Sequence, residues 1–315
     1  MVVTKMDGEK LKLAFYWAAS CGGCEIAVLD IDEKILDVLE IADIVFWPVA
    51  LDTKYAEVEK MPDKSIDVCF FNGAIRTEEN EHLAKLLRKK SKILIAFGSC
   101  ACYGGIPGLA NLWNKKEIFR RVYLETESTR NPGKTEPTTK TKITEGELTL
   151  PRFYDTVKTL EQTVDVDYFI PGCPPPKKLI LQAIEAIATK KLPEKGSYFA
   201  SNKSVCDECK REREEKNIPK ILRRHQAEPD PEKCLLDQGI ICMGPATRGG
   251  CDAMCLKANM PCTGCLGPCP GVTDQGAAMI SALASVMGLD REEKMSEEDV
   301  RSLMEQVVDP VGIFY

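Results

Sequence analysis

The sequence predicts an α/β protein: a parallel sheet domain followed by a cysteine-rich domain with little regular structure. Two observations predict this class. Residues 1–200 alternate between short apolar runs and helical stretches, the pattern of a parallel sheet covered by helices on both faces. Residues 206–269 then hold nine cysteines among many glycines and prolines, with little periodicity. We therefore expect one domain over residues 1–200 and a second over residues 201–315.

Five apolar runs are the candidate strands of the first domain. The first run alternates and then becomes continuously apolar, which is typical of a buried strand. The five runs lie at residues 11–17, 43–49, 66–72, 92–97 and 166–170. Because helical stretches separate them, the strands are expected to run parallel.

Helical spacing is clearest at residues 77–90 and 177–190, and residues 24–39 also show it. The apolar side chains on one side of that third helix are Ile26, Leu29, Leu36 and Leu39. The polar, turn-rich stretch 125–150 is interpreted as a surface excursion from the domain. Helical character returns after the cysteines, at residues 274–288 and in a helix for which Ser296 is the predicted N-cap.

Composition excludes several classes of function. The net charge of −6 argues against a nucleic-acid partner. No apolar run approaches the ~18 residues of a membrane helix. The first twelve residues, MVVTKMDGEKLK, lack an apolar signal core and a twin arginine, so we expect a cytoplasmic protein.

Cysteine usage points to metal ligands. The chain has 15 cysteines but only two histidines, His82 and His225. A cytoplasm keeps thiols reduced, so cysteines in this number are expected to bind metal, not to form disulfides. A zinc site could use cysteine alone, but histidine-poor, cysteine-rich ligation favours iron–sulfur clusters.

Four cysteines of the first domain follow the ends of predicted strands. Cys21 and Cys24 follow the first strand, and alone they could be a redox pair or half of a metal site. Cys100 and Cys173 follow two later strands. Carboxyl ends of parallel strands share one edge of the sheet, so the four thiols are expected to form one cluster site there.

Two other cysteines fit this site less well. Cys69 lies inside a predicted strand, where a small buried hydrophobe is the ordinary interpretation. Cys102 could compete with Cys100 as the ligand, but Cys100 lies nearer to the end of its strand. Glycine-flanked turns (GGC, GSC and PGC) set three of the four favoured placements, which lets the backbone approach a bulky cluster.

The nine cysteines of the second domain suit two four-cysteine sites and one spare residue. The simplest partition follows chain order. One site is Cys206, Cys209, Cys234 and Cys242, and the other is Cys251, Cys255, Cys262 and Cys265. Cys269 is then the spare, although by spacing it could replace Cys265 or Cys255. Two structural zinc sites are the alternative to clusters.

Four motifs carry a resemblance to a known family. They are SCGGCE (20–25), GSCACYGGIPG (98–108), PGCPPP (171–176) and PCTGCLGP (261–268). In this order they resemble the small, electron-transferring subunit of nickel–iron hydrogenases. The segments LDTKYAEVE, ELTLPRFYDTV and VDVDYFIPGCPPP resemble most the methyl-viologen-reducing hydrogenases that work with heterodisulfide reductase.

This resemblance implies a flavodoxin-like domain with a proximal [4Fe–4S] cluster and a second domain with medial and distal clusters. Many family members have a His-x-x-Cys pair at the distal cluster, where this chain has Cys206 and Cys209. Many also have proline in place of a fourth medial ligand, where this chain has Cys255. Both departures imply three all-cysteine [4Fe–4S] clusters.

The resemblance also implies partners. The nickel–iron site belongs to a large subunit, and the sequence DPVGIFY (309–315) lacks the cysteine pair of such a subunit. The chain is therefore expected to conduct electrons from the large subunit to an iron–sulfur or flavin protein linked to heterodisulfide reductase. An alternative is an electron-transfer subunit of the same fold with another partner, as in respiratory complex I, whose related subunit lacks the cysteine-rich segment. A third alternative is a zinc-stapled interaction module.

Overall fold

The computed structural model describes residues 10–214, 218, 220–287 and 296–307. The chain divides into two compact units, Met1–Phe199 and Ala200–Tyr315. Among the described residues, no helix has both the length and the apolar character needed to cross a membrane.

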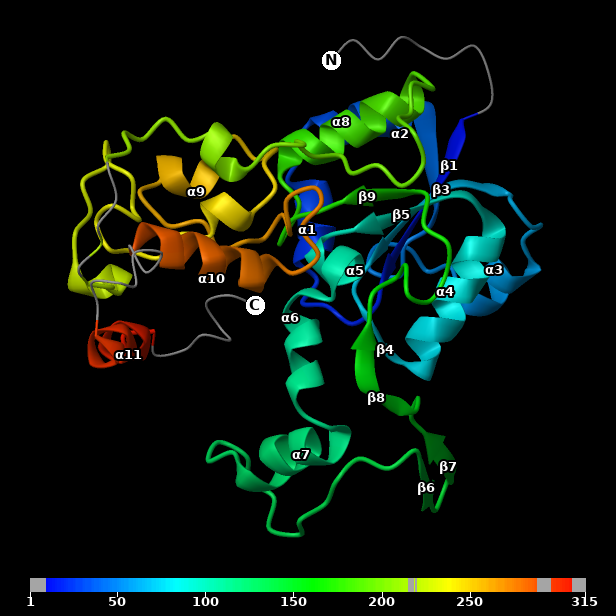
Figure 1. Cartoon of the computed structure of the whole chain (residues 1–315). Helices are drawn as coiled ribbons and strands as arrows, with labels where there is room; N and C mark the ends of the chain where they lie inside the picture. Colours follow the sequence, from blue (N-terminus) through cyan, green and yellow to red (C-terminus); the bar gives the residue numbers. More distant parts are fainter. Residues whose placement is uncertain (1–9, 215–217, 219, 288–295, 308–315) are drawn as a thin grey trace. The chain divides into compact units, whose positions relative to one another are not determined.

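The first unit contains a five-stranded parallel sheet with the order β2-β1-β3-β5-β9 (Figure 1). The strands are β1 (Leu11–Trp17), β2 (Ala42–Phe46), β3 (Ile66–Asn72), β5 (Ser91–Phe97) and β9 (Tyr168–Ile170). Counted within this sheet alone, the order is that of doubly wound, flavodoxin-like folds. The predicted fold class is confirmed, and the predicted strands 11–17 and 66–72 have the observed bounds.

Helices cover both faces of the sheet, because successive side chains in the strands are apolar and point alternately to opposite faces. Leu13 and Phe15 share one apolar layer with residues of α1 (Gly23–Leu29), α2 (Lys34–Ile41) and α8 (Lys177–Ala188). Ala14 and Tyr16 belong to the other layer. Residues of α3 (Tyr55–Lys60) and α4 (Glu78–Lys90) complete that second layer.

The single helix predicted over residues 24–39 is wrong. The chain forms α1 and α2 there, separated by a turn in which Asp32 has φ of 58°. The side chains that pack inward are Ala27, Val28, Val38 and Ile41. The four side chains expected to share one apolar side are all exposed: Ile26, Leu29, Leu36 and Leu39.

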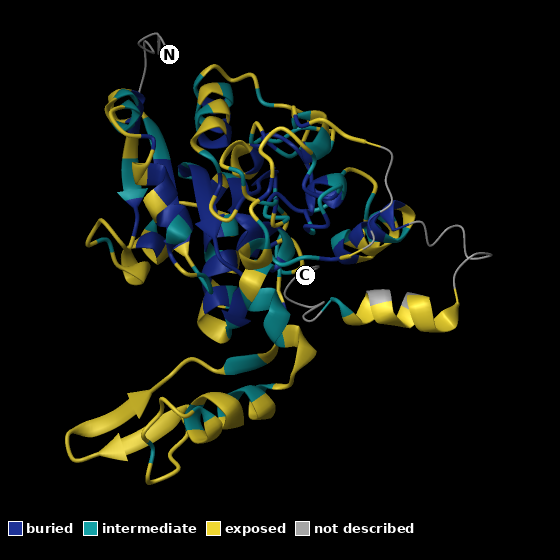
Figure 2. Ribbon diagram, turned by 90° about the vertical axis from the view of Figure 1, so that its left-hand side faces the viewer, coloured by how far each residue is buried: buried dark blue, intermediate teal, exposed yellow. Residues whose placement is uncertain are grey.

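The predicted surface excursion is confirmed as part of a longer exposed arm (Figure 2). After α5 (Ser99–Tyr103) the chain passes through short helical turns and α7 (Lys115–Phe119). The antiparallel pair β6 (Lys140–Ile143) and β7 (Gly146–Thr149) follows, and every residue of both strands is exposed. The chain returns through β8 (Phe153–Lys158), which pairs with β4 (Ile75–Thr77).

The second unit has little regular structure before its last helices. Its elements are the 3₁₀ turns η3 (Val205–Asp207), η4 (Arg224–Gln226) and η5 (Gly244–Ala246) and the helices α9 (Met254–Lys257), α10 (Gln275–Val286) and α11 (Glu297–Glu305). One apolar cluster contains residues of η3, η5, α9 and α10, and it includes Leu235, Ile240, Met279 and Leu283. The predicted cap at Ser296 is confirmed, since its hydroxyl accepts from the Asp299 backbone N–H at 3.2 Å.

Candidate metal centres

The first two cysteines lie in the turn between β1 and α1. Cys21 is exposed and Cys24 is buried in the first turn of α1. Gly22, between them, has φ of +83°, and a Cβ there would lie 3.0 Å from the Trp17 ring. Only glycine combines this positive φ with so close an approach to a ring at little cost. Gly22 therefore fixes the turn that positions the sulfurs of Cys21 and Cys24.

Backbone hydrogen bonds join the loops that carry the other two cysteines. Gly98 N–H donates to the Ile170 carbonyl at 2.8 Å, and Ser99 N–H donates to the Gly172 carbonyl at 2.8 Å. Cys100 in α5 is buried, and Cys173 after β9 is exposed. The loops after β5 and β9 are therefore fixed against each other at the carboxyl edge of the sheet.

The sulfur of Cys24 packs against the backbone of the Cys100 loop. A Cβ built on Gly98, whose φ is +86°, would lie 2.3 Å from the Cys24 sulfur. A Cβ on Gly105 would lie 3.0 Å from the Cys100 sulfur. These approaches leave no space for a side chain, and they place main-chain groups next to both buried sulfurs.

Electrostatic coupling links the four thiols. Burial raises the pKa of the Cys24 thiol, and the other three thiols raise it further. Burial, with Cys173 and Cys21, raises the pKa of Cys100 to about 11. Burial and then Cys21 raise the pKa of Cys173. These thiols would need a bound cation to ionise together, and four convergent cysteines are the donor set of a [4Fe–4S] cluster.

The two remaining cysteines of the first unit belong to its apolar core. Cys69 is fully buried within β3, as predicted. Cys102 is also buried, and its thiol donates to the Ala96 carbonyl at 3.4 Å. Cys102 lies near enough to Cys24 and Cys100 for both thiols to raise its pKa, but its hydrogen bond directs it toward the sheet.

The second unit brings together Cys206, Cys209, Cys234 and Cys242. Burial raises the pKa of Cys206 to about 12; the Arg213 charge lowers it, and the three other thiols raise it. A Cβ on Gly244 would lie 3.1 Å from the Cys206 sulfur and 3.6 Å from the Cys242 sulfur. Glycine thus allows the backbone to lie between these two sulfurs.

Electrostatic interactions among the other four cysteines also cross the predicted partition. Burial raises the pKa of Cys262 to about 12; the Cys242 thiol raises it further, and the Cys265 thiol contributes less. Burial also raises the pKa of Cys251, with smaller contributions from Glu208 and then Cys255.

A backbone hydrogen bond links the two cysteine sets of this unit. The Cys262 N–H donates to the Cys242 sulfur at 3.3 Å. The spare residue of the predicted partition, Cys269, donates its thiol to the Pro245 carbonyl at 3.8 Å. The partition of these cysteines into sites stays a prediction.

A single-metal arrangement is absent from the described residues. No group of three or more His, Cys, Asp or Glu side chains there is placed to hold one metal ion.

A buried polar network lies beside Cys24. The Glu25 carboxylate accepts hydrogen bonds from Trp47 Nε1 and Asn72 Nδ2, and Ser20 Oγ donates to Asn72 Oδ1 at 2.7 Å. Burial raises the pKa of Glu25. The Glu25 side chain, in the first turn of α1, thus binds groups from β3 and from the residue after β2. The signal for this network was Asn72, a polar residue at the end of an otherwise apolar strand.

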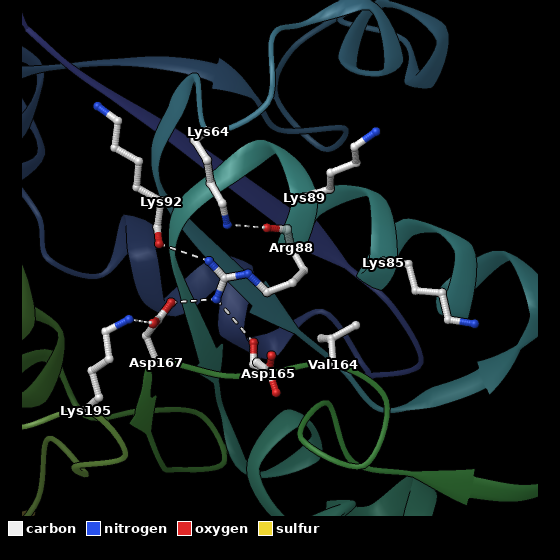
Figure 3. Close-up of a pocket in the computed structure, with 9 residues that line it drawn as sticks. All are labelled: Lys64, Lys85, Arg88, Lys89, Lys92, Val164, Asp165, Asp167 and Lys195. Atoms are coloured by element: carbon white, nitrogen blue, oxygen red, sulfur yellow. Dashed lines mark hydrogen bonds and ion pairs between the residues drawn. The ribbon is translucent and has the colours of Figure 1, made fainter.

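One hollow of the first unit has no cysteine in its lining. It is an open hollow of about 650 Å³ near the amino end of β5 (Figure 3). Asp167 accepts from Arg88 at 2.6 Å, from Lys195 at 2.6 Å and from the Leu94 N–H at 2.8 Å. The side chains that extend away from the Arg88 guanidinium are Lys85, Lys89 and Lys92. This network of ion pairs fixes the end of α4, which carries Arg88, against the loops at this edge of the sheet.

Comparisons with known proteins follow the same division of the chain. The family model "NADH ubiquinone oxidoreductase, 20 Kd subunit" matches residues 21–187, more than half of the chain. This match contains Cys21, Cys24, Cys100 and Cys173 and ends before the cysteine-rich segment.

Two relatives match most of the chain. The iron–sulfur subunit of an F420-non-reducing hydrogenase from Archaeoglobus profundus is 46% identical over 283 residues, which cover 88% of this chain and 88% of the relative. The corresponding subunit of the F420-non-reducing hydrogenase from Methanothermobacter thermautotrophicus is 39% identical over 313 residues, which cover 98% of this chain and 94% of the relative.

A solved structure supports the fold. The [NiFeSe] hydrogenase of Desulfovibrio vulgaris Hildenborough aligns with a TM-score of 0.53 at 16% identity, over 86% of this chain and 97% of that one. At this identity the likeness concerns the fold alone. Taken with the family model and the relatives, the chain belongs to the NADH ubiquinone oxidoreductase 20 Kd subunit family and, within it, to the small subunits of nickel–iron hydrogenases of the methyl-viologen-reducing type.

Proposed function

We propose that this hydrogenase small subunit conducts electrons between a large subunit, where dihydrogen is oxidised, and a further iron–sulfur or flavin protein. Three all-cysteine [4Fe–4S] clusters would supply one-electron transfer when bound. The residues of the chain hold these groups, exclude water from them and set their distances from one another. The single observation that carries the proposal is that the three cysteine-bearing loops meet at one edge of the parallel sheet. The Ser99 N–H donates to the Gly172 carbonyl at 2.8 Å, and a Cβ on Gly98 would lie 2.3 Å from the Cys24 sulfur.

The proximal site would use Cys21, Cys24, Cys100 and Cys173. Two of these residues are buried and two are exposed, so the site is open on one side. An open side suits electron exchange with a partner that docks there. The exposed side chains of Trp17 and Ile26, close in sequence to the CGGC turn, are apolar, as an interface to a large subunit requires.

The distal site would use Cys206, Cys209, Cys234 and Cys242, and the medial site Cys251, Cys255, Cys262 and Cys265. The hydrogen bond from the Cys262 backbone to the Cys242 sulfur supports neighbouring sites. Glu212, Arg213 and Glu214 are exposed just after Cys209, and a charged rim steers encounter with a second protein. The next part of that charged segment, residues 215–217 and 219, lies outside the described residues.

The acceptor that we propose is an iron–sulfur or flavin protein linked to heterodisulfide reductase, in the cytoplasm. The two relatives are F420-non-reducing hydrogenases by name, which supports a hydrogenase that delivers electrons elsewhere than to F420. A same-fold subunit serving another oxidoreductase is the second candidate, because the matching family model is named for a respiratory subunit. Identification of the subunits that co-purify with the native chain separates the two.

Metal analysis of the anaerobically purified complex tests the clusters. We expect about twelve iron atoms and as many sulfides in this chain, four for each of three [4Fe–4S] clusters. The other subunits also contain iron. The iron measured in a tagged large subunit, isolated alone, is subtracted from the total. Zinc in place of iron, or a three-iron EPR signal in protein never exposed to oxidant, would contradict the proposal.

A further inference from the structure

Arg211 is a buried cation in the second unit. Its side chain contacts four neutral acceptors. Nη1 donates to the carbonyls of Asp230 and Lys233, each at 3.0 Å. Nη2 donates to the Leu256 carbonyl at 2.8 Å and to Asn259 Oδ1 at 2.8 Å. The residue is only 9% exposed.

These contacts lie next to cysteines of both proposed sites. Arg211 itself follows Cys209 by two residues, and one of its acceptor carbonyls belongs to the residue before Cys234. Another belongs to the residue after Cys255. The guanidinium thus ties two segments of the distal set to the helix that carries a medial cysteine.

The charge of Arg211 has no carboxylate partner within the described part of the chain. All four acceptors are carbonyl or amide oxygens, and Nε is buried without a hydrogen-bond acceptor. An arginine keeps its charge in proteins, and a buried charge is costly unless an opposite charge compensates it. The thiolates of the two adjacent cysteine sets are the negative groups that the sequence places nearby.

We propose that Arg211 is a positioning residue that holds the distal and medial cysteine sets together and raises the reduction potential of the groups they bind. This inference rests on the proposed function. Reduction adds one electron and no proton, so the reduced state carries one more negative charge. The buried guanidinium stabilises that state more than the oxidised one, in a low-dielectric setting where solvent screens it little.

Two substitutions abolish the uncompensated positive charge by different routes. Arg211→Met deletes it. Asn259→Asp leaves Arg211 in place and puts a carboxylate at the 2.8 Å contact; Asn259 has φ of 56°, a conformation that Asp also tolerates. In the purified complex, redox titration followed by EPR should show the signals of this chain about tenfold less reduced at a fixed potential, a shift of about 59 mV to lower potential for a one-electron couple.

Two control variants separate charge from packing. Lys210→Met removes the same charge from the preceding, exposed residue, where water screens it, and should leave the titration unchanged. Arg211→Lys keeps the charge but loses the forked contacts. It should lower the thermal stability and leave the reduction potential nearly unchanged. Should Arg211→Met fail to retain iron, Asn259→Asp and Arg211→Lys decide the question.

Unchanged potentials in an Asn259→Asp complex with full iron content would overturn the inference, as would an equal shift in Lys210→Met. Failure of the proposed function has a different signature. In that case the unaltered complex itself lacks the expected iron, sulfide and EPR signals, before any variant is made.

Discussion

Single residues decide the shape of the proximal site, and glycine is the clearest case. Gly98 has φ of 86° and ψ of 161°, a conformation essentially restricted to glycine. It also lies where any Cβ would collide with the Cys24 sulfur. The need for close backbone approach could be predicted from sequence, but which sulfur each glycine approaches could not, because that depends on how two strand ends pack.

We expect Gly98→Ala to lower iron retention sharply and to cost about 1–3 kcal/mol in backbone strain alone. The matched control is Gly108→Ala, since Gly108 has φ of −63° and nothing within 4 Å of its Cβ position. Iron content and thermal unfolding of the complex measure both effects. Equal iron retention in the two variants would contradict the steric account.

Cys100 and Cys102 differ in what they contact, although both are buried. Cys100→Ser should remove about four irons, one cluster's content, and stop electron delivery to the acceptor. Cys102→Ala should retain iron and activity, because its thiol donates to the Ala96 carbonyl inside the core. Iron analysis with an acceptor-reduction assay compares them, and the opposite pair of phenotypes would show that the ligand was assigned to the wrong cysteine.

At the scale of elements, the sheet was predictable and the helix after β1 was not. Parallel strands have a local signal in their continuous apolar runs, which placed β1 and β3 with their observed bounds. The break between α1 and α2 depends on the turn at Asp32, which periodicity does not reveal. The Glu25 network was also missed, because Trp47 and Asn72 come from distant parts of the sequence.

Helix α4 has an N-terminal capping box formed by Thr77 and Asn80. Thr77 Oγ1 accepts from the Asn80 N–H at 3.3 Å, and Asn80 Oδ1 accepts from the Thr77 N–H at 3.1 Å. Thr77→Ala should therefore destabilise the first unit by about 1 kcal/mol. Thr149→Ala, on the exposed strand β7, is the control and should have little effect on thermal unfolding. The capping argument fails if both variants unfold at the temperature of the unaltered protein.

At the scale of the whole molecule, the apolar cores of the two units differ in the elements and side chains that form them. The first has a conventional apolar core of aromatic and aliphatic side chains between sheet and helices. The second buries an apolar cluster of similar extent among short turns and α10, and several of its cysteines belong to that cluster or pack against it. Cysteine counting could predict a metal-dependent domain, but the contact between the Cys262 backbone and the Cys242 sulfur, which crosses the predicted partition, needed coordinates.

The central claim is that this chain carries electrons away from the large subunit and that Cys209 belongs to the exit site. The most direct test is Cys209→Ser in an assembled complex, with two activities measured on the same preparation. Reduction of the physiological acceptor should fall strongly. The isotope exchange between dihydrogen and deuterium, catalysed at the large subunit, should largely survive, because that reaction needs no electron to leave. Loss of both activities in a complex that stays assembled would contradict the claim, as would full acceptor reduction.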